Sequence, residues 1–260
     1  MSINKIKVTK NDTKFDVISN PSTQWIWNEI LQNRWEEQTF KIFDRFLKPE
    51  KSYFDIGAWI GPTVLYGANR AKRVYGVEPD PIAYHELLTN VIMNPEIASK
   101  VICINAAVAE KTEDKKLYMR HHFGDSTSSM IPTISSENYC KIRAVTINDL
   151  IKQHNIEDIN FIKMDIEGGE YSLIPFIQSY LEENHPTLYL SIHPGFLSQH
   201  YSLTLTENEV AEKLKNQTEN MLNHLSIYKN IYDIHGNQVK KEDVFQINNT
   251  GEFVFTNETW

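Results

Sequence analysis

The chain has 260 residues, a formal net charge of -8 and a hydrophobic fraction of 41%. This ordinary composition excludes collagen-like, coiled-coil and wholly disordered proteins, and the length allows one large domain or two small ones. The acidic balance disfavours non-specific binding to polyanions, so we expect no nucleic-acid partner. The N-terminus lacks an apolar secretory segment, and no apolar run approaches the ~20 residues that cross a bilayer. We therefore expect a cytoplasmic protein without membrane insertion; the composition leaves its oligomeric state open.

The chain begins with a segment that differs in pattern from the rest. Residues 1–20 are polar with short β-like pieces, and residues 25–47 carry apolar side chains mostly at helical spacing. We treat residues 1–48 as an N-terminal helical extension. From residue 49 on, short apolar runs alternate with helical stretches, which indicates βαβ units and a parallel sheet. Strands are expected at 52–57, 73–78, 101–109, 159–166 and 187–194, with helices at 63–70, 82–93 and 171–181.

An insertion at about residues 117–147 interrupts this alternation. It contains an expected edge strand at 117–123, a Ser/Thr-rich loop and a second strand at 141–147. A helix at 207–225, a strand pair near 226–239 with a turn at 235–237, and a last strand at 251–257 are expected to follow. A parallel sheet that ends in an antiparallel pair is one doubly wound α/β domain, which we assign to residues 49–260.

Two glycines follow the first expected strand, in Phe54-Asp55-Ile56-Gly57-Ala58-Trp59-Ile60-Gly61, just before a helix start at Pro62-Thr63. Glycine permits a tight turn and a close approach of ligand to backbone, and a helix start offers free N–H groups. The dinucleotide fingerprint G-x-G-x-x-G is incomplete here, because its third glycine has no counterpart. A ligand without a pyrophosphate therefore fits this turn better.

Acidic residues and one histidine follow the later strands. Glu78 closes the second strand about 20 residues after the glycine turn, where an acid can reach ribose hydroxyls. Asp165 and Glu167 follow the fourth strand, where ligands of open α/β sheets bind; alternatively, they favour the N-terminus of the next helix. His193 ends the fifth strand, beside the strand of Asp165.

The segments DIGAWIG, GVEPDP, KMDIEGGE and IHP, in this order over about residues 50–195, resemble the FkbM-type S-adenosylmethionine-dependent methyltransferases. The resemblance implies the class I methyltransferase fold, a Rossmann-like, mostly parallel seven-stranded sheet whose last pair is antiparallel. It also implies S-adenosylmethionine as cofactor and a hydroxyl as acceptor, often on a sugar or nucleotide-sugar of a surface polysaccharide or a natural product. Many relatives carry a Glu two residues before the histidine, where this chain has Ser191.

The resemblance also implies a set of cofactor contacts. The methionine and ribose part would lie among Asp55, Gly57, Ala58 and Gly61, with Glu78 on the ribose and Asn105 or Ala106 near the adenine. Thr63, Pro79 and Asp165 adjoin these turns and complete the expected cofactor set.

The chemistry requires help with the acceptor's proton, since a sugar hydroxyl is a poor nucleophile until a base or metal acts on it. His193, together with Asp165, is the candidate base. Asp165, Glu167 and His193 could instead bind Mg²⁺ or Mn²⁺. His122, Ser126 and Glu167 are candidates for binding the small-molecule acceptor, although a solvated polar loop explains the first two equally well. Trp25, Trp35 and Tyr66 could stack on sugar rings, with core packing favoured for Trp35.

Two other functions stay open. An NAD(P)-dependent oxidoreductase on a Rossmann-like sheet would bind a nicotinamide cofactor in place of S-adenosylhomocysteine. A non-catalytic partner subunit would bind the cofactor without turnover on any acceptor.

Overall fold

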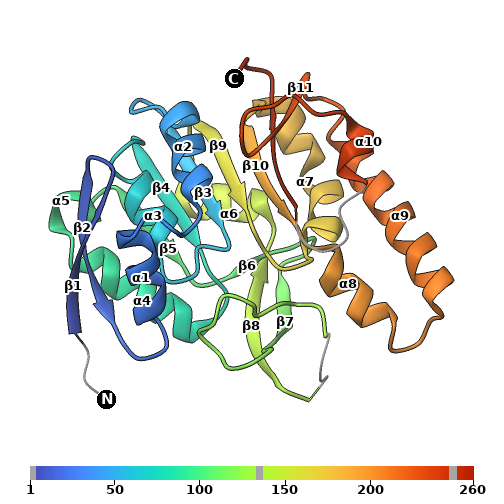
Figure 1. Ribbon diagram of the computed structural model, residues 1–260, viewed down its shortest axis with the longest axis horizontal. Helices are drawn as coiled ribbons and strands as arrows, with labels where there is room; N and C mark the ends of the chain where they lie inside the picture. The colour runs from blue at the N-terminus through green and yellow to red at the C-terminus, as the bar shows by residue number, and fades with distance from the viewer. Residues whose placement is uncertain (1–3, 133–136, 246–250) are drawn as a thin grey trace.

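The computed structural model describes residues 4–132, 137–245 and 251–260. Positions 1–3 of the expected extension and 133–136 of the expected insertion lie outside the described residues. A seven-stranded sheet runs through the middle of the protein in the order β11-β12-β10-β9-β3-β4-β5 (Figure 1). Neighbours from β10 to β5 are parallel, whereas β12 is antiparallel to both β10 and β11. The strands are β3 Ser52–Ile56, β4 Arg73–Val77, β5 Val101–Ile104, β9 Ile159–Met164, β10 Thr187–Ile192, β11 Asn230–Asp233 and β12 Gly251–Thr256. The predicted doubly wound α/β fold, with its antiparallel last strands, is confirmed.

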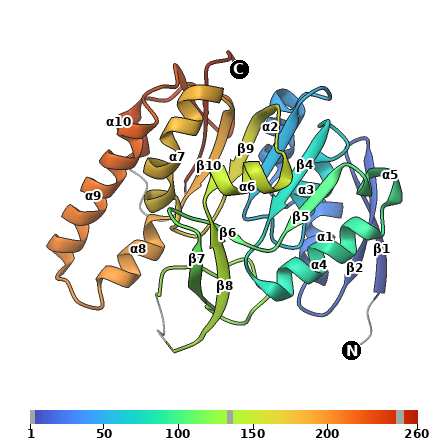
Figure 2. The same cartoon turned by 180° about the vertical axis from the view of Figure 1, so that it is seen from behind.

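Helices cover both faces of this sheet. Figure 1 shows α1 Gln24–Leu31, α2 Glu37–Phe46 and α3 Pro62–Gly67 in front of it, and α4 Pro81–Ile92 packs on the same face through Ala83 and Leu87. In Figure 2 the other face carries α6 Ile147–His154 and α7 Glu170–Asn184, with α9 Glu207–His224 beside α7. The remaining helices are α5 Pro95–Ala98, α8 Pro194–Tyr201 and α10 Lys241–Val244. No helix in the described part of the chain has the length and apolar character needed to span a membrane.

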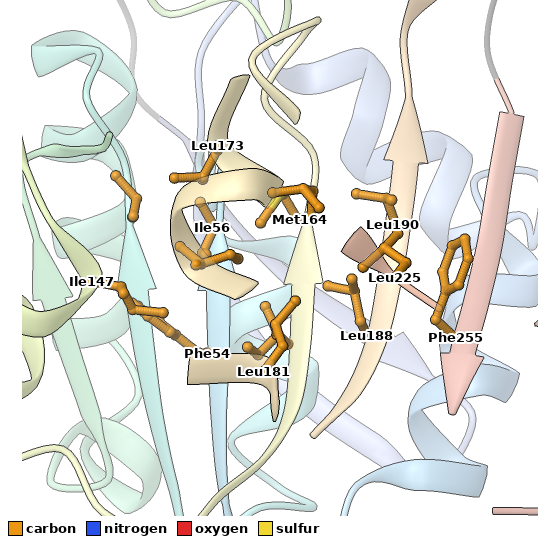
Figure 3. Close-up of a cluster of buried hydrophobic side chains, with 14 of the residues drawn as sticks. Phe54, Ile56, Ile147, Met164, Leu173, Leu181, Leu188, Leu190, Leu225 and Phe255 are labelled. Carbon is orange, nitrogen blue, oxygen red and sulfur yellow. The ribbon is translucent and has the colours of Figure 1, made fainter. Parts of the chain in front are cut away.

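The strands are apolar on both faces because both faces are buried. Successive side chains of a strand point to opposite sides, so Tyr53 packs with α2 and α3 while Phe54 packs with α6 and α7. Figure 3 shows the second of these cores, in which Phe54, Ile56 and Met164 lie under Leu173 and Leu181 of α7. The apolar runs predicted the strands for this reason.

The first described residues form a hairpin, in line with the short β-like pieces expected within residues 1–20. Strands β1 Asn4–Lys10 and β2 Thr13–Ser19 pair antiparallel, and the helical part of the extension is divided into α1 and α2. Two buried amides, Asn90 of α4 and Asn94 at the start of α5, hold the hairpin on the domain. Asn90 accepts a hydrogen bond from the Ile18 N–H (2.8 Å) and donates one to the Ile60 carbonyl (2.9 Å), and Asn94 pairs with both backbone groups of Asp16.

The insertion differs in detail from the prediction. The run expected as one strand at 101–109 is divided, because its second half, β6 Ala107–Val108, leaves the main sheet and pairs with β8 Tyr139–Val145. The edge strand β7 Glu113–Tyr118 also pairs with β8, and it ends before the two histidines, which lie in the following loop. The strand pair expected near 226–239 reduces to β11 and a single bridge between Tyr232 and Gln238.

Replacing Asn90 tests how strongly the hairpin is held. Asn90→Ala leaves the Ile18 N–H and the Ile60 carbonyl without their partner, and each such group costs ~1–3 kcal/mol. We expect the free energy of unfolding, measured by urea titration, to fall by about 2 to 4 kcal/mol. Asn184→Ala is the matched control, since its exposed amide bonds only to the Tyr180 carbonyl within α7. A loss no larger than that of the control would contradict the bridging role.

Candidate active site

A cavity of about 230 Å³ opens beyond the carboxyl ends of β3, β4, β9 and β10. Its walls come from α1 and the loop between α1 and α2, the turns after β3 and β4, the segment 106–108 after β5, the insertion, and the ends of β9, β10 and β12. The lining includes Trp35, Glu36, Gly57, Ala58, Trp59, Thr63, Glu78, Pro79, Ala106, Ser126, Ser128, Lys163, Asp165, Glu167, Ser191, His193 and Glu252. This is the edge of an open α/β sheet at which ligands bind.

The turn after β3 packs directly against the backbone of Asp165. Gly57 has a φ of 90°, and a Cβ atom built on it would lie 1.9 Å from the Asp165 carbonyl oxygen. The Gly57 and Ala58 N–H groups both donate to the Val77 carbonyl, and the Asp165 N–H donates to that of Ile56. Glycine at position 57 therefore brings the ends of three strands together at one point.

Glu78 lies at the end of β4 with its carboxylate held by backbone groups. Its Oε2 accepts the Trp59 N–H and its Oε1 accepts the Asp80 N–H, each at 2.8 Å. Burial raises the pKa of Glu78 to about 8, although both hydrogen bonds act in the opposite direction. The carboxylate is thus oriented toward the cavity and largely shielded from water.

The insertion loop is fastened over this end of the cavity. Asp80 accepts hydrogen bonds from the Gly124 N–H (2.7 Å) and the Ser128 hydroxyl (3.1 Å). The Trp59 indole N–H donates to the Gly124 carbonyl at 3.0 Å. Farther along, the Ser129 hydroxyl donates to the Glu167 carbonyl at 2.7 Å. These contacts place the Ser/Thr-rich loop between the ends of β4 and β9.

Three carboxylates surround one imidazole at the ends of β9 and β10. His193 Nδ1 lies 3.1 Å from Glu170 Oε1, and Nε2 lies 3.6 Å from both Asp165 Oδ1 and Glu167 Oε2. Glu170 is fully buried and also accepts the N–H groups of Ile166 (3.0 Å) and Gly168 (2.9 Å). Since an ionised carboxylate only accepts, Nδ1 carries the proton in this contact.

This arrangement sets the charges of the cluster. Burial alone lowers the pKa of His193, but Glu170, Asp165 and Glu167 outweigh it and raise that pKa to about 10. Burial opposes the ionisation of Asp165, yet Lys163 and His193 hold its pKa below the usual range. Burial raises the pKa of Glu167 to about 8. At neutral pH the protein therefore holds a doubly protonated His193 beside an ionised Asp165.

A buried lysine lies on the other side of Asp165. Lys163 Nζ is 3.2 Å from Asp165 Oδ2 and 4.0 Å from Asp55 Oδ1. Burial disfavours the ammonium, but Asp165, Asp55 and Glu36 reverse this and raise the pKa of Lys163 above its usual value. Asp55 itself is fully buried and accepts hydrogen bonds from Tyr53 (2.5 Å) and Thr63 (2.7 Å). Asp165 thus lies between two cations.

A family model of the methyltransferase FkbM domain matches residues 55–225. The chain belongs to the FkbM methyltransferase family. It is therefore an S-adenosylmethionine-dependent methyltransferase, and its sheet is that of the class I methyltransferases. The matched region contains the glycine turn, Glu78, the insertion, the acid–imidazole cluster and α9.

Solved structures show more distant likeness. The FkbM methyltransferase from Methylobacillus flagellatus is 18% identical, with a TM-score of 0.47 over 88% of this chain and 52% of that one, so the chain spans about half of that protein. TYW2 from M. jannaschii, solved with AdoMet, is 14% identical over 98% of this chain and 85% of that one, with a TM-score of 0.39. A precorrin-6y C5,15-methyltransferase from Geobacter metallireducens is 10% identical over 85% and 87%, with a TM-score of 0.41. No functionally curated protein matches the chain, and the family assignment rests on the matched domain.

Most of the predicted site residues of this FkbM domain line the cavity. Of the expected cofactor set, Gly57, Ala58, Thr63, Glu78, Pro79, Ala106 and Asp165 do so, as do His193, Ser126 and Glu167. Asp55 and Gly61 lie outside the lining: Asp55 is behind Thr63, and a Cβ atom on Gly61 would meet Leu87. Asn105 donates to the Glu78 carbonyl at 2.9 Å from outside the cavity. His122 is exposed in the insertion loop and does not line the cavity.

The sequence did not single out four residues of this site. Glu170 begins α7 and is the direct partner of His193. Lys163 and Glu252 are charged residues inside apolar strand runs, a signal that could have marked them as buried and paired. Glu36 carried no comparable signal, since it reaches the cavity from a loop. Trp25 and Trp35 line the cavity, whereas Tyr66 is fully buried in the core.

One group of possible metal ligands is found among the described residues. One ligand atom each of Asp165, Glu170 and His193 lie within 4.8 Å of one another. This group contains Glu170 in place of the Glu167 that the sequence suggested. Its imidazole is already hydrogen-bonded to Glu170, whereas Asp165 Oδ1 is buried without a hydrogen-bond partner among the described residues.

Glu170→Gln tests the charge state of this cluster. Removing one carboxylate should lower the pKa of His193, followed by NMR of the ring resonances, by about one to three units from its value of about 10. Since the folded-state pKa exceeds the 6.5 of an isolated histidine, the ionised imidazole stabilises the fold fully below about pH 6.5 and ceases to do so as pH rises through about 10. Glu182→Gln, an exposed acid on the same helix, is the control. A His193 pKa near 6.5 in the unaltered protein would refute this account.

Proposed function

We propose that this protein transfers a methyl group from S-adenosylmethionine to a hydroxyl of a small polar acceptor, a sugar or nucleotide-sugar of polysaccharide or natural-product biosynthesis. The observation that carries the proposal is one continuous cavity with the held carboxylate of Glu78 at one end and the Asp165–His193 cluster at the other. An acid that can bind ribose hydroxyls and an acid that can accept a proton thus line the same space.

The residues at the Glu78 end fit the adenosine part of the cofactor. Each oxygen of Glu78 accepts one backbone N–H and keeps further lone pairs, which can accept the two ribose hydroxyls. Gly57, Ala58 and Thr63 would flank the methionine part, and Pro79 and Ala106 the adenine. Asp55, Gly61 and Asn105 would act from behind the lining by fixing these turns. When bound, the cofactor supplies a methyl group on a positively charged sulfur.

The residues at the other end would deal with the acceptor's proton. Asp165 Oδ1 is buried and has no hydrogen-bond partner among the described residues. We assign to it the acceptance of the hydroxyl's proton, since its neighbours Lys163 and His193 keep it ionised. His193, already protonated in the free protein, would hold Asp165 in place and maintain its charge. Glu167 and Ser126 line the same space and would contact the acceptor.

A divalent cation is a separate proposal for the same cluster. Mg²⁺ or Mn²⁺ suits carboxylate ligands such as Asp165 and Glu170, and suits an imidazole less well. Binding through His193 would require the imidazole to lose a proton that it holds up to about pH 10. Dialysis against a chelator and readdition of either ion decides the matter, since activity indifferent to both would exclude it.

Glu78→Gln tests the cofactor end. The amide cannot accept through both of its termini, so one ribose hydroxyl and one backbone N–H lose their acceptor. We expect the dissociation constant for S-adenosylhomocysteine, measured by calorimetry, to rise about tenfold or more. Glu96→Gln, on the exposed side of α5, serves as control. Unchanged affinity of the Glu78→Gln variant would refute the cofactor assignment. A thermal shift of the unaltered protein with NAD or NADP, but not with S-adenosylhomocysteine, would refute it as well.

Asp165→Asn and His193→Ala test the proton-accepting end. Loss of the accepting carboxylate should lower kcat by about 10² to 10⁴. His193→Ala should lower kcat less and leave S-adenosylhomocysteine affinity nearly unchanged. The pH profile separates the two roles. If Asp165 accepts the proton, kcat is level from about pH 6 to 9; if a neutral His193 did so, kcat would rise toward about pH 10.

The reaction itself is tested with methyl-labelled S-adenosylmethionine and a panel of free, amino and nucleotide-linked sugars. The expected result is a labelled product that has gained one methyl group on oxygen. Saturable cofactor binding without any product from the panel would favour the non-catalytic partner subunit.

A further inference from the structure

The end of the cavity opposite Glu78 is built by residues outside the matched domain. Trp35 and Glu36 belong to the loop between α1 and α2, and Glu252 belongs to β12. Both segments lie beyond the 55–225 range of the FkbM domain. We call Trp35, Glu36, Ser191 and Glu252 the outer wall; Ser191 lies within the matched region and the other three lie outside it.

Strand alternation explains why polar groups gather there. Phe161, Tyr189 and Val254 point to the sheet face that the N-terminal extension covers. Residues two positions away in a strand share that face. Lys163, Ser191 and Glu252 therefore point the same way, toward α1 and α2. The extension lies over them, so that Lys163 and Ser191 are buried and Glu252 is half-buried.

Glu252 reaches the cavity beside a small residue. It lies directly opposite Ser191 in the β10–β12 register. Its Oε1 accepts a hydrogen bond from the Tyr189 hydroxyl at 3.0 Å and lies 3.5 Å from the Ser191 hydroxyl. Ser191 is short enough to leave space for this carboxylate. Burial raises the pKa of Glu252 above its usual value, against the opposing effects of the Tyr189 hydrogen bond and of the cations Lys163 and His193.

Glu36 faces Glu252 from the N-terminal extension. Its backbone is left-handed, with φ 42° and ψ 47°, and its Oε2 accepts the Thr39 hydroxyl at 3.2 Å. Burial raises the pKa of Glu36 to about 8, and the negative charges of Glu252 and Asp165 act in the same direction, against the opposing effect of Lys163. Two shielded carboxyl groups thus border the same space.

The cations of the described lining are already paired. Lys163 contacts Asp165 and lies near Asp55, and His193 contacts Glu170. Arg120, which also interacts with Glu167, stacks on the Phe196 ring at 3.5 Å and does not line the cavity. A phosphate placed at the outer wall would meet two carboxyl groups and no free cation, whereas an ammonium would gain two partners in a space of low dielectric.

A further observation, independent of Glu36 and Glu252, indicates that a polar group of a ligand binds in this cavity. The His193 side chain is 8% exposed and lines the same cavity. Its Nε2 lies 3.6 Å from the two nearest carboxylates, beyond hydrogen-bond distance, so its proton has no acceptor among the residues that the structure describes. Beside it, Asp165 Oδ1 is buried and has no hydrogen-bond partner among the described residues. A buried acceptor without a donor is costly unless a ligand supplies one, and an acceptor hydroxyl would do so.

We propose that Glu36 and Glu252 form a subsite for a protonated amine, and that the acceptor is an amino sugar or similar amino-polyol rather than a nucleotide-sugar. This inference rests on the proposed function and narrows its acceptor. The hydroxyl to be methylated would lie between Asp165 and His193. The amine would lie at the outer wall, with the ring against Trp35.

The test measures binding of matched probes to the protein saturated with S-adenosylhomocysteine, by calorimetry or saturation-transfer NMR. Glucosamine, glucose and glucose 1-phosphate share one ring and differ in charge. Unaltered protein should bind glucosamine about tenfold tighter than glucose, and glucose 1-phosphate most weakly. Glu36→Gln and Glu252→Gln should each bring the glucosamine-to-glucose ratio close to one while leaving S-adenosylhomocysteine affinity within about twofold. Glu219→Gln, an exposed acid on α9, should change neither.

The outcomes separate this inference from the function on which it rests. Failure of the unaltered protein to bind S-adenosylhomocysteine would refute the proposed function. If S-adenosylhomocysteine still binds, any of three results refutes the amine subsite alone. Glucosamine does not bind, glucose 1-phosphate binds as well as glucosamine, or the glucosamine-to-glucose affinity ratio is unchanged in both variants.

Discussion

The contact between the turn after β3 and the backbone of Asp165 determines the rest of the site. A side chain at position 57 would collide with the Asp165 carbonyl, and the Asp165 N–H in turn bonds to the carbonyl of Ile56. Strands β3 and β9 are therefore joined at their carboxyl ends. Glu78 joins the same point through the N–H of Trp59. One glycine thereby sets the spacing between the two ends of the cavity.

Around that point the protein buries charges that would be unfavourable alone. Asp55, Lys163, Asp165, His193 and Glu170 form a chain of alternating sign, with neighbouring groups between 3.1 and 4.0 Å apart. Each member compensates the burial of the next, so the loss of one would leave its neighbour uncompensated. This chain explains why His193 is protonated and Asp165 ionised in the same protein.

The sequence predicted the parts of this structure that depend on local pattern. The strands and the main helices of the sheet follow from apolar runs and helical spacing, and Glu78, Asp165 and His193 follow from their positions at strand ends. The remaining site residues depend on contacts distant in sequence. Glu36 reaches the cavity because the extension folds over one sheet face, and Glu252 because β12 pairs with β10 in one particular register. His122 was misplaced because β7 ends at Tyr118, a boundary that no turn residue marks.

The middle of the chain and its two ends supply different parts of the cavity. The cofactor turns and the acid–imidazole cluster lie within residues 55–225, which match the FkbM domain. Trp35, Glu36 and Glu252 lie in the flanking segments. On the proposed amine subsite, exchange of those flanks between relatives would alter the preference for an amine, whereas Ser126 and Glu167, which line the same cavity, belong to the middle of the chain. A chimera built at residues 49 and 226 would then take its amine preference from the protein that supplies the two ends.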